Sequence, residues 1–405
     1  MNTVSLTVEK PAAGGRMIAR LDGQVVLVSG AIPGERVNAR IERTGKGVLY
    51  AATVDVEAPS PDRRAVAGDP ECGGCLYAHV AYPRQLALKS DVIADAFARI
   101  AKLSLPERVA VASSPETGYR MRARLHMRGH RLGFFREGTH DICDVRATGQ
   151  LLPATCDVLD QLAAGINSLG LDVRELELSE NVDASNRAVS LDSANAMDAR
   201  STSRLGAIDG LTDFGPDAFV TERMTVAGVD VPFRRSVLAF FQGNRYLLNP
   251  LVEHVVASIP DDASAIDLYA GAGLFAVAAA AAKHARVRAV EGDRVSAADL
   301  VANAAAWDTV EPLRQPVEDF VHTSPATPDV MVVDPPRTGM SREALDGVIR
   351  MHAPKVIYVS CDVATLARDS RRLVESGYAI ERADAFDLFP NTPHVETVVM
   401  FRRSA

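Results

Sequence analysis

The chain has 405 residues, of which 47% are hydrophobic and 24% charged, and its formal net charge at pH 7 is −8. A chain of this length exceeds what one hydrophobic core usually serves, so we expect two or three domains. No apolar stretch approaches the roughly 20 residues that a membrane-spanning helix needs, so we expect no membrane association. The acidic balance speaks against a global attraction to nucleic acid, although it is compatible with a local basic surface.

The N-terminus and the cysteines indicate the compartment. The opening MNTVSLTVEKPAAGG has neither the basic n-region nor the apolar core of a signal peptide. An odd and sparse set of cysteines in a long chain argues for a reducing environment. The cysteines are at positions 72, 75, 143, 156 and 361. We therefore expect a cytoplasmic protein, and we expect it to be a monomer.

The first part of the chain is expected to form a small barrel. Short β-rich segments such as GQVVLVSG and GVLYAATVDV alternate with Gly and Pro at IPGE and TGKG, a spacing typical of small β-barrels. The stretch EAPSPDRR, with its prolines and clustered polar residues, is typical of a linker. We therefore place a first domain at residues 1–58.

A helix, a strand-rich region and an alternating region follow. Residues 83–103 carry apolar side chains at helical spacing, which predicts an amphipathic helix. A strand-like alternation with turns then continues to residue 235, and we expect a central α+β domain at residues 59–235 that contains the CGGC segment. From there on, apolar runs alternate with Ala-rich stretches, which is typical of a parallel sheet with crossover helices. We place this third domain at residues 236–405.

A basic stretch in the central domain indicates nucleic-acid binding. YRMRARLHMRGHRLGFFR (119–136) contains six Arg, two His and no acidic residue. On a β-strand, Arg120, Arg122 and Arg124 would share one face, and the apolar residues between them the other. Such a face suits phosphate contacts, so we predict that these arginines bind RNA. The alternative, a solvated face whose charges are paired elsewhere, is weakened by the absence of acids within the stretch.

The first strands of the third domain predict a nucleoside-type cofactor. In IDLYAGAGLF, Gly271 and Gly273 would let the backbone approach a ligand closely, although a plain βα turn explains two glycines equally well. The next strand ends in AVEGD, where Glu291, rather than Asp293, occupies the place that binds ribose hydroxyls. An NAD site would require glycine where Ala276 stands. The shorter D-x-x-x-G-x-G pattern favours S-adenosylmethionine.

Two further strand ends are expected at the same edge. VVDPPRTG places Asp334 before a rigid turn, and KVIYVSC places Cys361 at the end of the following strand. A cysteine after a β run is by itself more often a small core residue. Beside a methyl donor, however, a thiolate can add to C6 of a uracil and make C5 nucleophilic. We therefore interpret Cys361 as a nucleophile.

The same chemistry requires a general base that removes the C5 proton. Glu396 in NTPHVETVVMF is the candidate. If the last strand runs antiparallel to the others, its beginning lies at their carboxyl edge and Glu396 reaches the site. His394 is the rival base, and an exposed Glu on an edge strand is the alternative interpretation.

Together, these motifs resemble the RNA uracil-C5 methyltransferases, which form 5-methyluridine in tRNA and 23S rRNA. The resemblance is carried by FFQGNRYLLNPL (240–251), DLYAGAGLF, DPPRTG, VSCDVATLARD and FPNTPHVETV, in the family's order. The N-terminal barrel resembles a TRAM domain, an OB-type RNA-binding module, and CGGCLYAHVAYPRQLALKSDVI resembles the family's helix entrance. The resemblance implies a Rossmann-like α/β class I methyltransferase domain behind a TRAM barrel and a central α+β RNA-binding domain.

The resemblance also implies roles for individual residues. Cys361 is the implied nucleophile and Glu396 the implied base. Asp334 and Arg337 would orient the uracil. Phe240 would stack on the target base, with core packing as the alternative. The implied contacts to S-adenosylmethionine are Gln242, Tyr269, Glu291 and Asp334.

Several residues depart from the family's pattern. Residue 362 is Asp where the family usually has Asn, and residue 391 is Asn where His is common. A negative charge at Asp362 would tend to raise the pKa of Cys361. We therefore expect Asp362 to weaken the activation of the thiol unless it points away or is paired.

A larger departure concerns metal. Many relatives hold a [4Fe–4S] cluster with a C-x5-C-G-G-C run and a distant fourth cysteine. Here only Cys72 and Cys75 match the ligand pattern, because Val66 and Thr148 stand at the other two positions. Such a cluster usually needs four thiolates, so we expect no cluster and no other metal. Two further cysteines lie nearby in the sequence but are displaced from the pattern: Cys143 and Cys156.

We predict S-adenosylmethionine-dependent methylation of uridine C5 in RNA. The attached barrel favours 23S rRNA, because the tRNA-specific members considered lack that domain. Methylation of a tRNA uridine is the nearest alternative. Methylation of cytosine C5 also uses a thiolate, but typically within a Pro-Cys motif, which DPPRTG lacks. A non-catalytic RNA-binding protein with a relic cofactor fold is the alternative of a different class.

Overall fold

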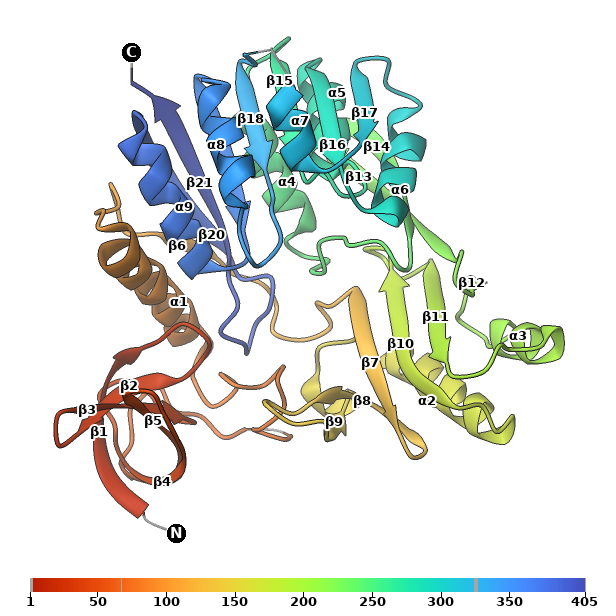
Figure 1. Cartoon of the computed structure of the whole chain (residues 1–405). Helices are drawn as coiled ribbons and strands as arrows, with labels where there is room; N and C mark the ends of the chain where they lie inside the picture. The colour runs from red at the N-terminus through yellow and green to blue at the C-terminus, as the bar shows by residue number, and fades with distance from the viewer. Residues whose placement is uncertain (1–2, 67, 324–326, 405) are drawn as a thin grey trace.

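The computed structural model describes residues 3–66, 68–323 and 327–404, and its N-terminal part is a closed barrel of five strands (Figure 1). Alternate side chains such as Leu6 and Val8 point into the barrel and are 2% exposed. The predicted OB-type barrel is therefore confirmed. In barrel order, the strands are β1 (Thr3–Pro11), β2 (Met17–Leu21), β3 (Gln24–Ser29), β5 (Val48–Ala58) and β4 (Arg36–Gly45).

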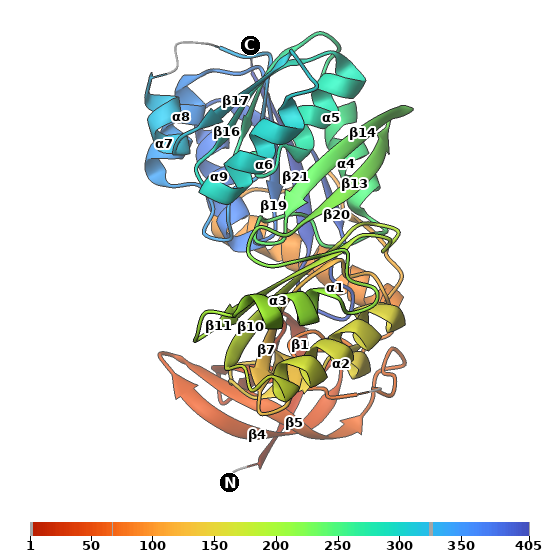
Figure 2. The ribbon, with the colours of Figure 1, turned by 90° about the vertical axis from the view of Figure 1, so that its right-hand side faces the viewer.

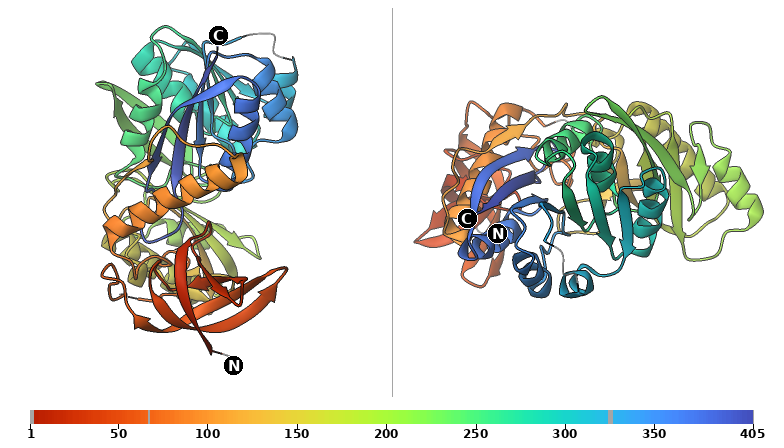
Figure 3. Two further views of the ribbon diagram at one scale, coloured as in Figure 1. Left: turned by 90° about the vertical axis from the view of Figure 1, so that its left-hand side faces the viewer. Right: turned by 90° about the horizontal axis from the view of Figure 1, so that it is seen from above.

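Helix α1 (Tyr82–Ala96) connects the barrel with the rest of the molecule. It continues as one π-helical segment, η1 (Phe97–Ala101), which confirms the predicted amphipathic helix. Figure 3 shows α1 crossing between the barrel and the C-terminal domain, where it packs against α9 (Val363–Glu375). On the barrel side, Lys10 of β1 forms an ion pair with Asp95 at 2.6 Å.

A six-stranded sheet with helix α2 (Pro153–Ser168) on its apolar face forms the central region. The alternation predicted for β7 is observed, since Ala123 and Leu125 are buried while Arg124 is exposed. In sheet order, the strands are β12 (Asp213–Phe214), β11 (Arg187–Ser193), β10 (Val173–Glu180), β7 (Arg122–Arg128), β8 (Arg131–Phe135) and β9 (Ile142–Asp144). The remaining elements are η2 (Arg146–Thr148) and α3 (Ala199–Gly206).

An eight-stranded sheet forms the core of the C-terminal domain. Its first five strands are parallel, and the three inner ones, β15, β18 and β19, are almost fully buried, which explains their nearly continuous apolar runs. In sheet order, the strands are β17 (Val310–Arg314), β16 (Arg286–Glu291), β15 (Ser264–Leu268), β18 (Val330–Val333), β19 (Lys355–Ser360), β21 (Glu396–Arg403), β20 (Tyr378–Phe386) and β6 (Ala110–Ala112). The Rossmann-like α/β fold is confirmed.

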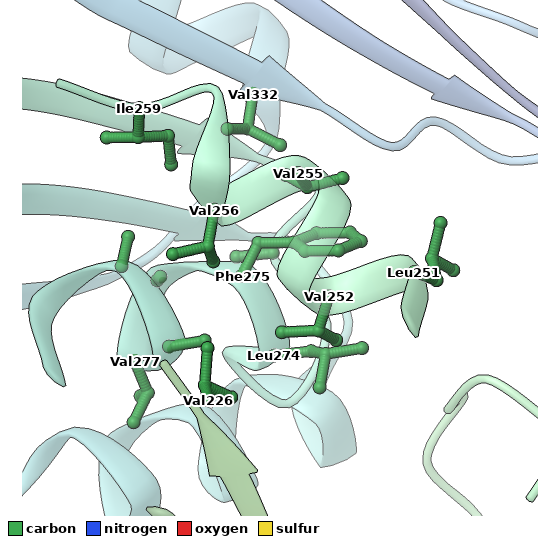
Figure 4. Close-up of a cluster of buried hydrophobic side chains, with 14 of the residues drawn as sticks. Val226, Leu251, Val252, Val255, Val256, Ile259, Leu274, Phe275, Val277 and Val332 are labelled. Carbon is green, nitrogen blue, oxygen red and sulfur yellow. The ribbon is translucent and has the colours of Figure 1, made fainter. Parts of the chain in front are cut away.

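Helices cover both faces of this sheet. The helices of one face are α4 (Leu248–Ala257), α5 (Leu274–Lys283) and α6 (Arg294–Ala304). Those of the other face are α7 (Val317–Thr323), α8 (Arg342–Arg350) and α9, together with α1. Figure 4 shows how Val252 and Val255 of α4 pack beside Leu274 and Phe275 of α5. No helix in the described part of the chain is long and apolar enough to cross a membrane.

Two segments expected in the central domain pack with the C-terminal domain instead. Strand β6 extends the eight-stranded sheet by pairing in parallel with β20. The hairpin of β13 (Phe219–Val226) and β14 (Val229–Ser236) packs on α5 and α6 (Figure 2). Residues 59–235 therefore do not form one packed unit, because the partners of these segments lie far away in the sequence. The domain boundaries themselves stay a prediction.

The loop 387–395, between β20 and β21, is anchored by α1. Lys89 and Asp387 form a fully buried ion pair, with both side chains at most 1% exposed. Beside it, Gln85 and Asn391 exchange two hydrogen bonds of 2.9 Å, from the Gln85 amide to Asn391 Oδ1 and from the Asn391 backbone N–H to Gln85 Oε1. A buried charge is tolerated only when it is paired, so the helix and the loop are held in one arrangement.

The barrel and the central region contact the same loop. A Cβ atom at Gly15 of the barrel would lie 2.9 Å from the ring of Pro393, so the Gly15 backbone packs directly on this ring. Tyr119, which precedes β7, donates its hydroxyl to the carbonyl of Pro390 at 3.3 Å. The loop 387–395 is therefore the place where all three parts of the molecule meet.

Replacing Lys89 alone should destabilise the protein strongly. We expect Lys89→Met to lower the free energy of unfolding by about 3–5 kcal/mol, because the charge of Asp387 stays buried without its partner. Combining it with Asp387→Leu should recover most of the loss. Denaturant unfolding measures both values. The control is Arg371→Ala, which breaks an exposed pair with Glu375 and should change the value by less than about 0.5 kcal/mol. A Lys89→Met variant as stable as the native chain would contradict this account.

Candidate active site at the carboxyl edge of the sheet

The structure brings Cys361 and Glu396 to the same edge of the sheet. Strand β21 runs antiparallel to β19, as expected for the last strand, and Ser360 pairs with Thr397. The pairing ends there, and Cys361 and Glu396 are the next residues on the two segments. Glu396 is 4% exposed, and its Oε1 has no hydrogen-bond partner among the described residues. The alternative of an exposed edge-strand glutamate is therefore wrong.

Asp334 and Gln242 complete this group from two other segments. Asp334 follows β18, and the amide of Gln242 donates to its Oδ2 at 3.4 Å. The negative charge of Asp334 acts on both Cys361 and Glu396. The FFQGN segment, the DPPRTG segment, the nucleophile segment and the last strand therefore converge, as the sequence analysis expected.

The surroundings of Cys361 favour the neutral thiol in the free protein. Burial raises the pKa of Cys361 to about 12, and the negative charges of Glu396 and Asp334 contribute to the rise, whereas Arg337 opposes it. Burial also raises the pKa of Asp334 to about 7. It raises the pKa of Glu396 well above the ordinary value, with the charge of Asp334 as the next cause.

Asp362 caps helix α9 and does not face the thiol as a free charge. Its Oδ1 accepts the backbone N–H groups of Ala364 at 3.0 Å and Thr365 at 2.9 Å. Such a cap satisfies donors that the first turn of a helix leaves unpaired. The carboxylates that raise the pKa of Cys361 are Glu396 and Asp334 instead. Asp362 is therefore paired, which is the condition under which the sequence analysis expected no weakening of the thiol's activation.

The loop after β15 is shaped to receive a ligand. Gly271 (φ 56°) and Gly273 (φ 88°) adopt left-handed conformations, and no atom lies within 4 Å of where a Cβ of Gly271 would be. Tyr269, which is not a glycine, also has a positive φ of 61°, a strained conformation that is typical of functional sites. Glu291 accepts the backbone N–H of Gly271 at 2.8 Å, so the acid that ends β16 lies against the loop.

Asp267, the first letter of the D-x-x-x-G-x-G pattern, was not among the predicted site residues. It is 1% exposed, its Oδ2 accepts the backbone N–H of Ala276 at 3.0 Å, and its Oδ1 has no partner within the described part of the chain. Burial raises its pKa, and the charges of Asp334 and Glu291 add to the rise. An open backbone cradle lined by acids fits a cofactor with ribose hydroxyls and positive charge, as S-adenosylmethionine has.

The basic face of β7 is paired with acids of the neighbouring strand. Glu177 of β10 forms ion pairs with Arg124 at 2.5 Å and with Arg122 at 3.7 Å, and Glu175 pairs with Arg124 at 3.7 Å. The charges of Arg122 and Arg124 are therefore paired elsewhere, as the alternative interpretation held, and their binding of RNA stays a prediction. Glu175 and Glu177 lie far from the basic stretch in the sequence, so only the strand pairing identifies them as its partners.

Arg120 and Phe240 make contacts of a different kind from the ion pairs of Arg122 and Arg124. The Arg120 guanidinium donates to Gln150 Oε1 at 2.7 Å and lies over the ring of Phe389 at 5.6 Å. Phe240 is 60% exposed, so the alternative of core packing is wrong, and Arg122 lies 5.9 Å from its ring centroid. An exposed aromatic ring beside an arginine is suited to stacking with an unpaired base.

The cysteines of the central region do not fit an iron–sulfur cluster. Cys72 forms a disulfide with Cys143, and Cys75 and Cys156 are buried free thiols. Among the described residues, no three or more His, Cys, Asp or Glu side chains are grouped to hold a metal. We derive no chemical step through a cluster, and its absence stays a prediction. The disulfide differs from the reduced cysteines that a cytoplasmic location predicts.

Comparison with known proteins agrees with this geometry. The family described as tRNA (Uracil-5-)-methyltransferase matches residues 213–404, and the TRAM domain family matches residues 2–61. A 23S rRNA (uracil(1939)-C(5))-methyltransferase of Pseudomonas entomophila is 31% identical over 98% of this chain and 93% of its own. An uncharacterized RNA methyltransferase of Thermotoga maritima is 29% identical over 97% of both chains.

A solved structure shares the fold over nearly the whole chain. The tRNA (uracil-54, C5)-methyltransferase of Pyrococcus abyssi has a TM-score of 0.77 at 23% sequence identity, covering 98% of this chain and 99% of its own. The fold and the edge site together define an S-adenosylmethionine-dependent RNA methyltransferase of class I. The chain belongs to the RNA uracil-C5 methyltransferase family, with a TRAM domain at its N-terminus. The alternatives of a cytosine methyltransferase and of a non-catalytic RNA-binding protein are therefore wrong.

The alkylation rate of Cys361 should report on its charged neighbours. Only the thiolate reacts, so in the free protein we expect slow alkylation by iodoacetamide at pH 8 and a rate that rises with pH toward the thiol pKa of about 12. Glu396→Gln removes a negative charge that raises this pKa, so it should accelerate the reaction at pH 9 by about three- to tenfold. Glu375→Gln, at the far end of α9, is the control. A rate that Glu396→Gln leaves unchanged would place Glu396 away from the thiol.

Thiol counting tests the disulfide. When the protein is unfolded in guanidinium chloride without reductant, we expect three reactive thiols, from Cys75, Cys156 and Cys361. After reduction, all five cysteines should react. Five reactive thiols without reductant, or bound iron with inorganic sulfide, would contradict the pairing of Cys72 with Cys143.

Proposed function

We propose that this enzyme methylates C5 of a uridine in RNA through a covalent bond between Cys361 and C6 of the base. The observation that carries the proposal is the convergence of Cys361, Glu396 and Asp334 at one sheet edge beside the Gly271 loop. When it is bound, S-adenosylmethionine supplies an electrophilic methyl group, and the bond between this methyl group and the sulfonium sulfur breaks, which leaves S-adenosylhomocysteine. Gln242, Tyr269, Glu291 and Asp334, with Gly271 and Gly273, are proposed to hold it.

The proposed chemistry assigns one role to each residue at the edge. The Cys361 thiolate adds to C6, and the electrons of the C5–C6 double bond move toward C5, which takes the methyl group. Arg337, which favours the negative form of the thiol, and Asp334 are proposed to orient the uracil. Phe240 is proposed to stack on the base or its neighbour.

We propose Glu396 rather than His394 as the base. Glu396 takes the C5 proton, the electrons of that C–H bond restore the C5–C6 double bond, and the Cys361 sulfur leaves as thiolate. The raised pKa of Glu396 supports this role, since a buried carboxylate is a stronger base than an exposed one. Burial and nearby positive charges, first among them Arg337, lower the pKa of His394 to about 4, which makes it a weaker base.

Among RNA substrates, we propose 23S rRNA. The presence of a barrel does not distinguish the substrates, since the Pyrococcus abyssi tRNA methyltransferase aligns with 98% of this chain. The support is instead the whole-chain similarity to the 23S rRNA (uracil(1939)-C(5))-methyltransferase of Pseudomonas entomophila, at 31% identity. A cytoplasmic location and a monomeric state are part of the proposal.

RNA that contains 5-fluorouridine tests the covalent mechanism. With fluorine at C5 the last step is blocked, so incubation with S-adenosylmethionine should leave a stable protein–RNA adduct. The adduct should disappear in Cys361→Ala. On ordinary RNA, Glu396→Gln should lower turnover at least about 100-fold and accumulate the methylated adduct. The absence of an adduct with both 23S rRNA and tRNA would refute the mechanism.

A substrate comparison tests the choice of RNA. Unmodified transcripts of 23S rRNA and of tRNA are offered separately, and the product nucleoside is identified by mass spectrometry. We expect 5-methyluridine in the 23S rRNA at least about ten times faster than in tRNA, which corresponds to about 1.4 kcal/mol of discrimination. Equal rates, or methylation of tRNA alone, would overturn this assignment without touching the mechanism.

A further inference from the structure

The distal part of the nucleophile segment, Arg368 and Asp369 on α9, has no role in the chemistry proposed above. Asp369 is 1% exposed and faces away from solvent. Its carboxylate accepts the backbone N–H of Met340 at 3.0 Å, the Tyr358 hydroxyl at 2.8 Å and the Nε–H of Arg368 at 2.7 Å. A buried carboxylate that accepts three hydrogen bonds is held in one position.

Arg368 links the carboxylate of Asp369 to the backbone of the DPPRTG segment. Its Nη2 donates to the carbonyls of Met340 at 3.0 Å and Thr338 at 3.3 Å. Between them, Gly339 has a φ of 73°, and a Cβ there would lie 2.6 Å from Arg368 Nη2. Arg368 therefore holds the loop 337–340 closely against α9.

The contact between Arg368 and this loop bears on Arg337, which lies at the start of the loop. Within the ranges that the structure describes, the Arg337 guanidinium has no hydrogen bond or ion pair, and only its carbonyl is bonded, to the Thr365 hydroxyl at 3.3 Å. The place of this side chain thus depends on the backbone that carries it. Its positive charge nevertheless acts on Cys361 and Glu396.

We propose that Arg368, supported by Asp369, is a positioning residue that fixes the loop 337–340 against α9, where Thr365 already bonds the Arg337 carbonyl, so that the charge of the exposed Arg337 side chain favours the Cys361 thiolate. Cys361 lies directly before Asp362, the N-cap of α9, and Arg368 lies about one and a half turns into the same helix. One helix therefore carries both the segment that holds the thiol and the residue that holds the loop of Arg337. The inference deepens the proposed function and rests on Cys361 as its nucleophile, but it concerns a property of the free protein.

A double-mutant cycle separates this role from a merely structural one. If Arg368 acts on the thiol through Arg337, its removal should have no further effect once Arg337 is gone. If Arg368 only stabilises the fold, its effect on the thiol should be the same with and without Arg337.

The experiment measures iodoacetamide alkylation of Cys361 in the free, full-length protein between pH 7 and pH 10, with the modified peptide quantified by mass spectrometry. Arg337→Ala should slow the reaction about three- to tenfold at a fixed pH, by removing the cation that favours the thiolate. Arg368→Ala should slow it by a similar factor, and Arg368→Lys by less. The double variant should react like Arg337→Ala alone. Arg371→Ala, whose side chain pairs with Glu375 on the exposed face of α9, is the control and should react like the native protein.

Three outcomes would overturn the inference: native-like alkylation in Arg368→Ala, factors that multiply in the double variant, or an Arg371→Ala control that slows equally. If Arg368→Ala does not fold, as judged by denaturant unfolding, Arg368→Gln combined with Arg337→Ala completes the cycle. The cycle needs neither RNA nor cofactor. Its failure is therefore distinguishable from failure of the proposed function, which would appear as the absence of the 5-fluorouridine adduct.

Discussion

The buried ion pair between Lys89 and Asp387 is the contact on which the site geometry depends. It joins α1 to the loop 387–395, and this loop determines where β21 enters the sheet and therefore where Glu396 lies relative to Cys361. Two buried charges cannot separate without losing several kcal/mol, so the loop has one place available to it. Because the barrel and the central region contact the same loop, the position of the last strand depends on all three parts of the chain.

In the free protein, the surroundings of the sheet edge keep Cys361 in its unreactive thiol form. Burial raises the pKa of Cys361 to about 12, the carboxylates of Glu396 and Asp334 add to the rise, and Arg337 opposes it. A thiol in this state resists adventitious alkylation and oxidation, since both reactions need the thiolate. The proposed chemistry therefore requires that binding of positively charged or hydrogen-bonding ligands changes this balance.

RNA recognition by an acidic protein needs its positive charge to be placed locally. Two arginines of β7, Arg122 and Arg124, are paired with Glu175 and Glu177 of β10, so the strand has less unpaired positive charge than its composition indicates. The groups beside the edge site are of another kind: Arg120, stacked on an aromatic ring, and the exposed Phe240. Such groups suit an unpaired base and its adjacent phosphates more than a long duplex.

Much of this protein is determined by its sequence alone. Apolar runs ending in Gly271, Glu291, Asp334 and Cys361 predict parallel strands, and parallel strands bring their carboxyl ends to one edge whatever the details of packing. The tertiary structure decided what depends on non-local partners. It paired Arg124 with Glu177, turned Asp362 into a helix cap and added β6 to a sheet far from it in the chain. Strand order, pairing and burial are set by contacts between distant segments. Such contacts cannot be predicted from local composition and spacing.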